Sequence, residues 1–211
     1  EFSPKKENYP FYMAPDQENF RGLHASQLLS QQKEKLNLDS FLQLAYDPYL
    51  PAFSFLIPEL LGSISSTLPA AYAPAIQLLR TWDYRTSKES VSMSIAHFYG
   101  ENYQRRFRSL NRFAQEDPKA KIPNSSEIQA VFIQTLEQMN RDFGNWNTPW
   151  GEINRFQRLS GVIDADFDDS KSYVPVGLAS GNWGALASFG ARATSTTKRL
   201  YGYRGNSFVA V

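Results

Sequence analysis

The sequence predicts an α+β fold, with a mainly helical block over about residues 20–144 and short antiparallel strands over about residues 146–211. Apolar residues recur at helical spacing through the first block, as they do in helices with one buried face. After Gly144 the chain becomes aromatic and glycine-punctuated, which is typical of short strands and tight turns. The chain is 42% apolar and 20% charged, so it can bury a core.

Three segments follow from this pattern: a loop rich in proline and tyrosine over residues 1–19, the helical block over residues 20–144, and a β-rich segment over residues 145–211. The sequence starts at Glu1 without methionine, and Ser207–Val211 reads as a strand that stops within its run. We therefore expect the 211 residues to be a piece of a longer protein.

The helical block begins with a helix expected over residues 20–35. Asn37 or Asp39 is expected to cap the next helix, because a short side-chain oxygen can accept a free first-turn N–H. Prolines then interrupt the pattern, since proline lacks the backbone donor of a helix interior. An almost entirely apolar helix follows, and we expect it to be buried on most sides and kinked or restarted near Pro58.

Two later helices carry cap signals. Thr86 and Glu89 have the spacing of a capping box, in which a hydroxyl and a carboxylate each accept from the other residue's backbone N–H. Asn124 or Ser125 is expected to cap a long helix that ends at Gly144, the residue type most common just after a helix.

The segment Thr148–Leu159 alternates between two sets of residues and is interpreted as a strand with one polar side. Glu152 and Arg155 are expected to form internal pairs that hold the helical block to the sheet. The alternative is a polar strand that lines a substrate cleft.

Composition excludes several classes of protein. Lys and Arg total 22 against 21 Asp and Glu, which is unlike the basic surface of a nucleic-acid-binding protein. No apolar run is long enough to span a membrane, and no signal peptide starts at Glu1. The absence of cysteine excludes disulfides, a cysteine nucleophile and thiolate metal sites.

The residues alone show no complete active site. His24 and His97, the two histidines, have no metal-ligand partner at helical spacing. His97 is expected at a helix surface or core edge, with a metal or catalytic role as the alternative. No G-x-S-x-G nucleophile elbow and no phosphate-binding loop is present.

An acidic run resembles the start of a calcium loop, because a hard cation prefers several oxygen ligands on one turn. The sixth position is Asp169 instead of glycine and the twelfth is Pro175 instead of glutamate, which excludes an EF-hand. We expect an exposed acidic turn, with a cation site as the alternative. Its carboxylates belong to Asp164, Asp166, Asp168 and Asp169.

Several stretches resemble the penicillin acylase family, which includes acyl-homoserine-lactone and aculeacin acylases and belongs to the N-terminal-nucleophile hydrolases. The most specific are "TPWGEINRFQRL" and "GNSFVAV"; the others are "NYPFYMAPDQENFRGLHASQLL", "LLRTWDYRTSKES", "PVGLASGNWGALASFGAR" and "TTKRLYGYRGNSFVAV". They occur in the family's order over nearly the whole chain.

The resemblance implies a precursor that cleaves itself into an α chain and a β chain. The first residue of the β chain, normally serine, is the nucleophile, and its own α-amino group is the base. An asparagine side chain and a backbone N–H hold the oxyanion. This chain would then be a late segment of the β chain, within a larger αββα fold. The nucleophile and the oxyanion asparagine would both precede residue 1.

One family functional residue is matched, Arg21 in "NFRGLHASQLL". The resemblance implies that this arginine supports the hydrogen-bond network near the nucleophile; the alternative is a helix-end ion pair, for example with Glu18. Asp16 does not match the family's cation-binding aspartate. We expect no cofactor and no metal ligand on this chain, although the parent enzyme could hold a structural calcium ion.

The implied function is hydrolysis of linear amides in the periplasm or outside the cell, with the isolated chain inactive. The implied partners are the remainder of the parent acylase, namely the α chain and the N-terminal part of the β chain, and a small amide substrate; neither nucleic acid nor a membrane is expected. Penicillins, lactone N-acyl chains and bile or peptide amides all remain open as substrates. The alternative is a free-standing, aromatic-rich binding module for sugars or peptides.

Overall fold

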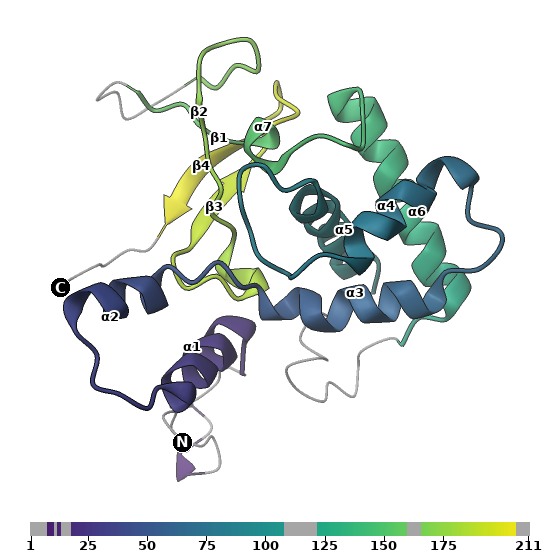
Figure 1. Ribbon diagram of the computed structural model, residues 1–211. Coiled ribbons are helices and arrows are strands. Elements are labelled where there is room, and N and C mark those ends of the chain that lie inside the picture. Colours follow the sequence, from purple (N-terminus) through teal and green to yellow (C-terminus); the bar gives the residue numbers. More distant parts are fainter. Residues whose placement is uncertain (1–7, 11, 14–17, 108–121, 160–165, 206–211) are drawn as a thin grey trace.

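The computed structural model describes residues 8–10, 12–13, 18–107, 122–159 and 166–205. Within them the protein is α+β, with about half of the chain helical and a small four-stranded sheet (Figure 1). The helices are α1 (Phe20–Gln31), α2 (Leu38–Ala45), α3 (Pro51–Ser63), α4 (Ala73–Arg80), α5 (Val91–Phe107), α6 (Ser125–Phe143) and α7 (Trp150–Ile153), with 3₁₀ turns η2 (Ala70–Tyr72) and η4 (Gly181–Trp183). The strands are β1 (Asn154–Phe156), β2 (Val174–Pro175), β3 (Phe189–Arg192) and β4 (Leu200–Gly205).

The predicted caps of α2 and α6 are confirmed. Asn37 caps α2 and forms a capping box with Ser40. Asn124 caps α6 and forms a capping box with Glu127, which satisfies two first-turn N–H groups. Gly144 ends α6 in the left-handed conformation, at φ 82°.

A kink or a restart was expected near Pro58, and the restart is excluded, because α3 runs through Pro58 as one helix. Pro51 stands at its start, where the missing N–H of proline has no partner to lose. The helix buries a full face, including Leu56, Ile57 and Leu60, while Phe55 remains 44% exposed. It is therefore buried on most of its sides, although not all.

The capping box expected from Thr86 and Glu89 is wrong. The Thr86 hydroxyl donates to the carbonyl of Gly177 instead. Ser90 takes the capping role for α5, because its hydroxyl accepts from the Met93 N–H at 3.0 Å. The sequence has the capping-box pattern, but the Thr86 hydroxyl bonds to a distant loop instead of the helix start.

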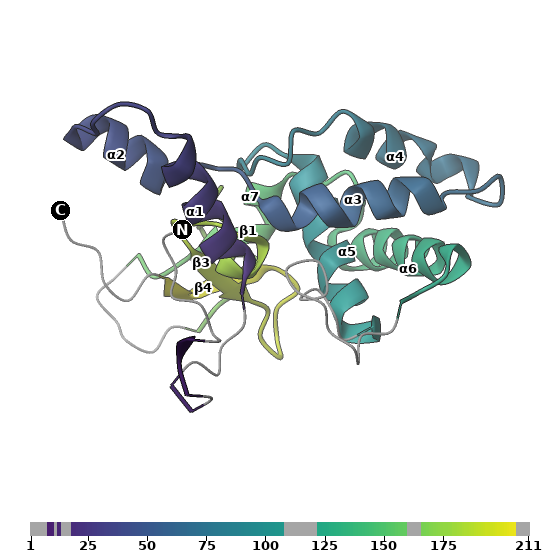
Figure 2. The same cartoon turned by 90° about the horizontal axis from the view of Figure 1, so that it is seen from below.

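Helix α5 is the centre of the helical part. Figures 1 and 2 show α3, α4, α5 and α6 gathered on one side of the molecule, with the strands, α1 and α2 on the other. From Ser92 to Gly100 every residue of α5 is buried. The core continues from α5 into the β-rich segment through Trp150 and Trp183, which are 2% and 0% exposed.

The sheet is mixed, with strand order β2-β1-β4-β3, so the expectation of antiparallel strands throughout is corrected. Strands β1 and β2 pair antiparallel, as do β3 and β4, but β1 and β4 pair in parallel with Asn154 opposite Leu200. The parallel pair arises because β4 returns beside β1 after a long connection that contains β2 and β3.

The strand predicted over Thr148–Leu159 is only partly formed. Trp150–Ile153 is a helical turn, and the strand starts at Asn154. The turn is fixed from outside, because the Trp150 and Gly151 N–H groups donate to carbonyls of the segment that precedes α5, at 3.1 and 2.7 Å. Arg155 is 4% exposed and is internal as expected, but its Nε donates to the backbone carbonyl of Glu152 at 2.7 Å.

Candidate functional site

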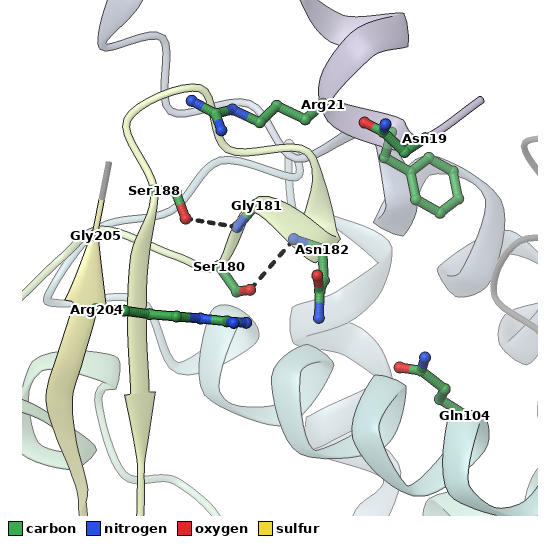
Figure 3. A pocket seen from close by; sticks show the side chains of 10 residues that line it. Asn19, Arg21, Gln104, Ser180, Gly181, Asn182, Ser188, Arg204 and Gly205 are labelled. Atoms are coloured by element: carbon green, nitrogen blue, oxygen red, sulfur yellow. Dashed lines mark hydrogen bonds between the residues drawn. The ribbon is translucent and has the colours of Figure 1, made fainter. Parts of the chain in front are cut away.

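A surface cavity of about 510 Å³ lies where the start of α1, one face of α5, η4 and the end of β4 meet (Figure 3). It contains Arg21, the residue matched to the family's catalytic support. The lining is polar, with two arginines, three amides and two serines. Its residues are Asn19, Phe20, Arg21, Gln104, Ser180, Gly181, Asn182, Ser188, Arg204 and Gly205.

Arg21 is positioned by the first turn of α1. Asn19 caps this helix by accepting from the Gly22 N–H at 2.9 Å. The Arg21 Nη2 donates to the carbonyl of Leu186 at 2.8 Å, across a separation of 165 residues. This bond holds the start of α1 against the loop that follows η4, so Arg21 connects two walls of the cavity.

The η4 wall is ordered by serine hydroxyls. Ser180 caps η4, because its Oγ accepts from the Asn182 N–H at 3.2 Å. The Ser188 Oγ accepts from the Gly181 N–H at 3.0 Å, which joins η4 to the residue before β3. Figure 3 shows both bonds beneath Arg21. The exposed Asn182 side chain therefore projects from a fixed turn.

Both histidines act on the turn that ends η4. The His24 Nδ1 donates to the carbonyl of Gly184 at 2.8 Å, and its Nε2 lies 3.4 Å from Asp47 Oδ1. The His97 Nδ1 accepts from the Trp183 indole N–H at 3.1 Å. Burial lowers the pKa of His97 to about 3, because the protonated ring is poorly solvated there, and the neutral ring can act as this acceptor.

His97, expected at a helix surface or core edge, is 9% exposed and packs against Trp150 and Trp183. His24 is 1% exposed. The histidines share no metal centre. Among the residues that the structure describes, no group of three His, Asp or Glu side chains could hold a metal ion.

Arg204 enters the cavity from β4. It pairs with Gly190 of β3, and a Cβ atom on Gly190 would lie 2.6 Å from the Arg204 Cγ. Because Gly190 has no side chain, the aliphatic part of the Arg204 side chain can cross β3 at this position. Figure 3 shows its guanidinium directed towards Ser180 and Asn182.

A second cavity of about 550 Å³ lies between α5, α6 and β3–β4. Its charged lining residues are of both signs: Glu101, Arg105, Asp142, Arg192 and Lys198. Burial raises the pKa of Glu101, opposed by the charge of Arg105. A narrow cavity of about 80 Å³ lies between the two larger ones and shares residues with each. The cavities lie around α5, with Gln104 lining the first, and Glu101, Asn102 and Arg105 lining the second.

The aspartates of the acidic run have structural partners. Asp168 accepts from the Ser170 hydroxyl at 2.7 Å and from the Ser170 N–H at 2.8 Å, and these two bonds lower the pKa of Asp168. The Asp169 carboxylate accepts from the Lys198 N–H and the Tyr201 hydroxyl, both at 2.9 Å. Asp169 therefore ties its turn to β4. Asp166 is exposed, whereas Asp164 lies outside the described residues, as does Asp16.

The family resemblance singled out Arg21, which lines this cavity, but sequence reasoning singled out none of the residues around it. Ser180 and Asn182 lie in a stretch interpreted only as a Gly-rich turn, and Arg204 lies in a stretch interpreted only as a strand. The signal that could have found them was the pattern S-x-N, in which a serine caps a short helical turn and leaves the amide exposed. Nothing local indicated that Arg204 would reach the same cavity.

None of the helices in the described ranges combines the length and the apolar character needed to cross a membrane. A comparison with curated proteins finds no match. A comparison with protein families matches residues 2–211 to penicillin amidase. This match covers nearly the whole chain, including the cavity around Arg21 and both flanking segments. The chain therefore belongs to the penicillin amidase family.

Proposed function

We propose that this chain is a late β-chain segment of an acylase that hydrolyses linear amides through an acyl-enzyme on an N-terminal serine. The observation that carries the proposal is the position of Arg21 on the wall of a polar cavity, in a chain that belongs to this family. The serine and the oxyanion asparagine come from other segments of the same precursor, within its αββα fold. No cofactor takes part.

The reaction transfers the acyl group to the serine. The serine hydroxyl attacks the amide carbon while the α-amino group of the same residue takes its proton. The tetrahedral oxyanion collapses, the C–N bond breaks, and the amine leaves with that proton. Water then attacks the ester by the same route and releases the acid.

Arg21 acts as a support in this scheme. Its guanidinium is always charged, and it holds the loop after η4 through the Leu186 carbonyl at 2.8 Å. A positive charge fixed at this place favours negative charge on the transition state without having to reorient during the reaction. Lysine would keep the charge but lose the planar geometry.

The test is Arg21→Lys in the intact enzyme that carries this chain. We expect kcat to fall about tenfold or more, since preorganised polar support of this kind is worth a few kcal/mol. KM should change less, because the support acts on the transition state. Arg192→Lys, an exposed arginine of β3 outside this cavity, is the matched control. An unchanged kcat in Arg21→Lys would leave Arg21 as a helix-end contact, worth about 1 kcal/mol of stability or less.

The purified 211-residue chain should give only background with phenylacetyl and long-acyl amide reporters. Turnover that survives repurification and disappears in a single Ser→Ala variant would overturn the proposal that the nucleophile lies elsewhere. We further propose a periplasmic or secreted location, and the α chain and the N-terminal part of the β chain as partners.

Two buried tryptophans count against the alternative of an aromatic binding module. Trp150 and Trp183 are buried and pack against His97, with ring centroids 4.7 and 5.8 Å from the imidazole. A side chain that stacks on a sugar or peptide needs an accessible ring face. These two tryptophans instead join the helical part to the β-rich segment.

A further inference from the structure

We propose that His24 is a positioning residue for the amide hydrolysis, which acts through Arg21 by fixing α1 against the segment Gly184–Leu186. This role rests on the proposed acylase function and deepens it, because the placement of Arg21 then depends on a second residue of the same helix. Four structural features point to it: the spacing of the two side chains on α1, the burial of His24, the rigidity of its partner Gly184, and the orientation of the imidazole ring.

Arg21 and His24 bind the same loop from one face of α1. They are three residues apart, so their side chains lie about one helical turn apart on that face. The Arg21 guanidinium donates to the carbonyl of Leu186 at 2.8 Å, and the His24 Nδ1 donates to the carbonyl of Gly184, also at 2.8 Å. A carbonyl oxygen can only accept, so Nδ1 carries the proton of this bond. The helix therefore donates two side-chain hydrogen bonds to the loop that follows η4.

Helix α1 has few buried anchors. Of its residues, all of which the structure describes, only Phe20 and His24 are buried, at 3% and 1% exposure. The Phe20 ring packs against Phe55 of α3, with ring centroids 6.1 Å apart, and such an apolar contact has little directional preference. A hydrogen bond weakens steeply when donor and acceptor are misaligned. Of these two anchors, His24 is thus the one that fixes the rotation of α1, and with it the direction of Arg21.

The partner of His24 is itself held in place. Gly184 has φ 104°, a left-handed conformation that glycine adopts without strain, and a Cβ atom on it would collide with the Pro51 ring. Its backbone therefore lies directly against the start of α3. The Gly184 N–H also donates to the Gly181 carbonyl at 3.0 Å. The bond from His24 thus ties α1 to a point that both η4 and α3 hold.

The imidazole ring of His24 is oriented by its surroundings. It packs against Tyr49 in an edge contact, with ring centroids 5.7 Å apart and an interplanar angle of 67°. Its Nε2 lies 3.4 Å from Asp47 Oδ1, and the same oxygen accepts the Tyr49 N–H at 2.8 Å. A side chain whose rotamer is locked by packing and by polar neighbours holds its own partner in a defined geometry. His24 therefore presents Nδ1 to Gly184 in one fixed direction.

Loss of this bond would leave Arg21 on a helix held mainly by the apolar contact of Phe20. The Arg21 side chain also packs on η4, since a Cβ atom on Gly181 would lie 3.5 Å from Arg21 Cδ. A small rotation of α1 would therefore move the guanidinium relative to the cavity wall. A misplacement of about 1 Å caused by a distant mutation can lower a rate by about a hundredfold. His24 should thus affect kcat and leave KM nearly unchanged, as expected of Arg21.

The first test compares three substitutions of His24 in the intact enzyme, with an N-phenylacetyl amide as the reporter. His24→Leu removes both ring nitrogens and should lower kcat about tenfold, with KM changed less than about twofold. His24→Asn offers an N–H near the position of Nδ1 and should recover most of this loss, whereas His24→Gln offers one near Nε2 and should not. Equal recovery by asparagine and glutamine would exclude the bond to Gly184 as the cause.

A stability control distinguishes positioning from a merely structural role. Asn124→Ala removes the cap of α6 and should lower the melting temperature without changing kcat, because this cap lies outside the cavity of Arg21. All rates are measured well below the lowest melting temperature of the set. If His24→Leu lowered the melting temperature alone, as Asn124→Ala does, the positioning role would be overturned.

The second test is a double-mutant cycle between His24 and Arg21. If His24 acts through Arg21, adding His24→Leu to Arg21→Lys should lower kcat less than about twofold further, against about tenfold in the wild type. Residues that act independently would multiply their effects, to about a hundredfold in the double variant. That outcome would give His24 a role of its own and contradict the proposal.

Amide hydrogen exchange separates this role from the acylase function, because it needs no turnover. The Trp183 and Gly184 N–H groups donate to the carbonyls of Ser180 and Gly181, both at 3.0 Å. His24→Leu should speed the exchange of these two amides, and His24→Asn should restore most of their protection. With that result, an enzyme that hydrolysed no amide would contradict the acylase proposal alone, and the fixing of α1 to the loop would stand. Unchanged exchange in His24→Leu would overturn the positioning role itself.

Discussion

His24 on α1 and His97 on α5 hydrogen-bond to consecutive residues of one turn, Gly184 and Trp183. The chain's two histidines thus hold η4 from two helices that are far apart in sequence. Asn182, on the cavity wall, is the residue just before this pair of contacts. The geometry of the cavity around Arg21 therefore depends on two buried imidazoles, although neither of them lines that cavity.

We predict that His97 makes stability depend on pH. Its pKa is about 3 in the folded protein against an ordinary value of 6.5, so below pH 6.5 the unfolded chain binds a proton that the folded protein does not. Stability is therefore present above pH 6.5 and is lost as the pH falls towards 3. From pH 7.5 to pH 5 the free energy of unfolding should fall by about 2 kcal/mol through this residue.

The measurement is urea unfolding at both pH values for wild type and His97→Asn. Asparagine places an oxygen acceptor near the position of Nδ1 and does not titrate. The wild type should lose about 2 kcal/mol more than the variant over this range. Parallel losses in the two proteins would show that His97 is not the titrating group.

We predict opposite effects for the same substitution at two helical glycines. A Cβ atom at Gly100 would lie 2.6 Å from the Trp183 ring, whereas one at Gly62 meets no atom within 4 Å. Gly100→Ala should therefore destabilise the protein by roughly 1–3 kcal/mol, as overpacking does in cores. Gly62→Ala should stabilise it by roughly 0.5–1 kcal/mol, because alanine favours the helix. Thermal melts of both variants decide the matter, and equal shifts would contradict the close packing of Trp183 on α5.

Gly184→Ala should be more harmful than Gly144→Ala. Both glycines have positive φ, 104° and 82°, which alanine adopts only at a cost of about 1 kcal/mol or more. Only at Gly184 would the Cβ atom also collide, at 2.4 Å from the Pro51 Cδ. Chemical denaturation should show a difference of at least about 1 kcal/mol between the variants. If Gly144→Ala proved as harmful, the contact between η4 and the start of α3 would not be tight.

Arg155→Lys should destabilise the protein by roughly 2–4 kcal/mol, although the charge is kept. The guanidinium of this buried arginine donates to the carbonyls of Glu152 and Asp169 at 2.7 and 3.0 Å and lies 3.6 Å from the Tyr173 ring centroid. A lysine ammonium cannot make all three contacts in this arrangement. Arg192→Lys at an exposed position should change stability by less than about 0.5 kcal/mol. A melting temperature for Arg155→Lys equal to that of Arg192→Lys would contradict this role.

The helices could be predicted because their signals are local. The cap at Asn37, the capping box at Asn124 and the stop at Gly144 each depend on residues within one helical turn. A cap predicted from the local sequence does not form where a distant segment binds the capping side chain. The Thr86 hydroxyl bonds to Gly177, 91 residues away, so the expected capping box is not formed.

The sheet and most of the site depend on such distant contacts. Alternation from Trp150 to Arg155 looked like a strand, but backbone contacts with the segment before α5 bend its first half into a turn. Arg21 was found through the family resemblance to its helix. Arg204 could not be found, because its place depends on the pairing of β4 with Gly190, which no short stretch of sequence encodes.

The bond from Arg21 to Leu186 spans 165 residues, which has a consequence for the order in which the chain folds on the ribosome. Helices α3 to α6 can pack on one another as soon as residue 143 has emerged, since the contacts among these four helices lie within the helical block. The cavity also needs η4 and Arg204, so α1 must wait while some 180 further residues are synthesised, which takes roughly 10–40 s at the usual rate. During that interval its later binding face, including the aromatic ring of Phe20, has no partner from η4 and is available to chaperones or proteases.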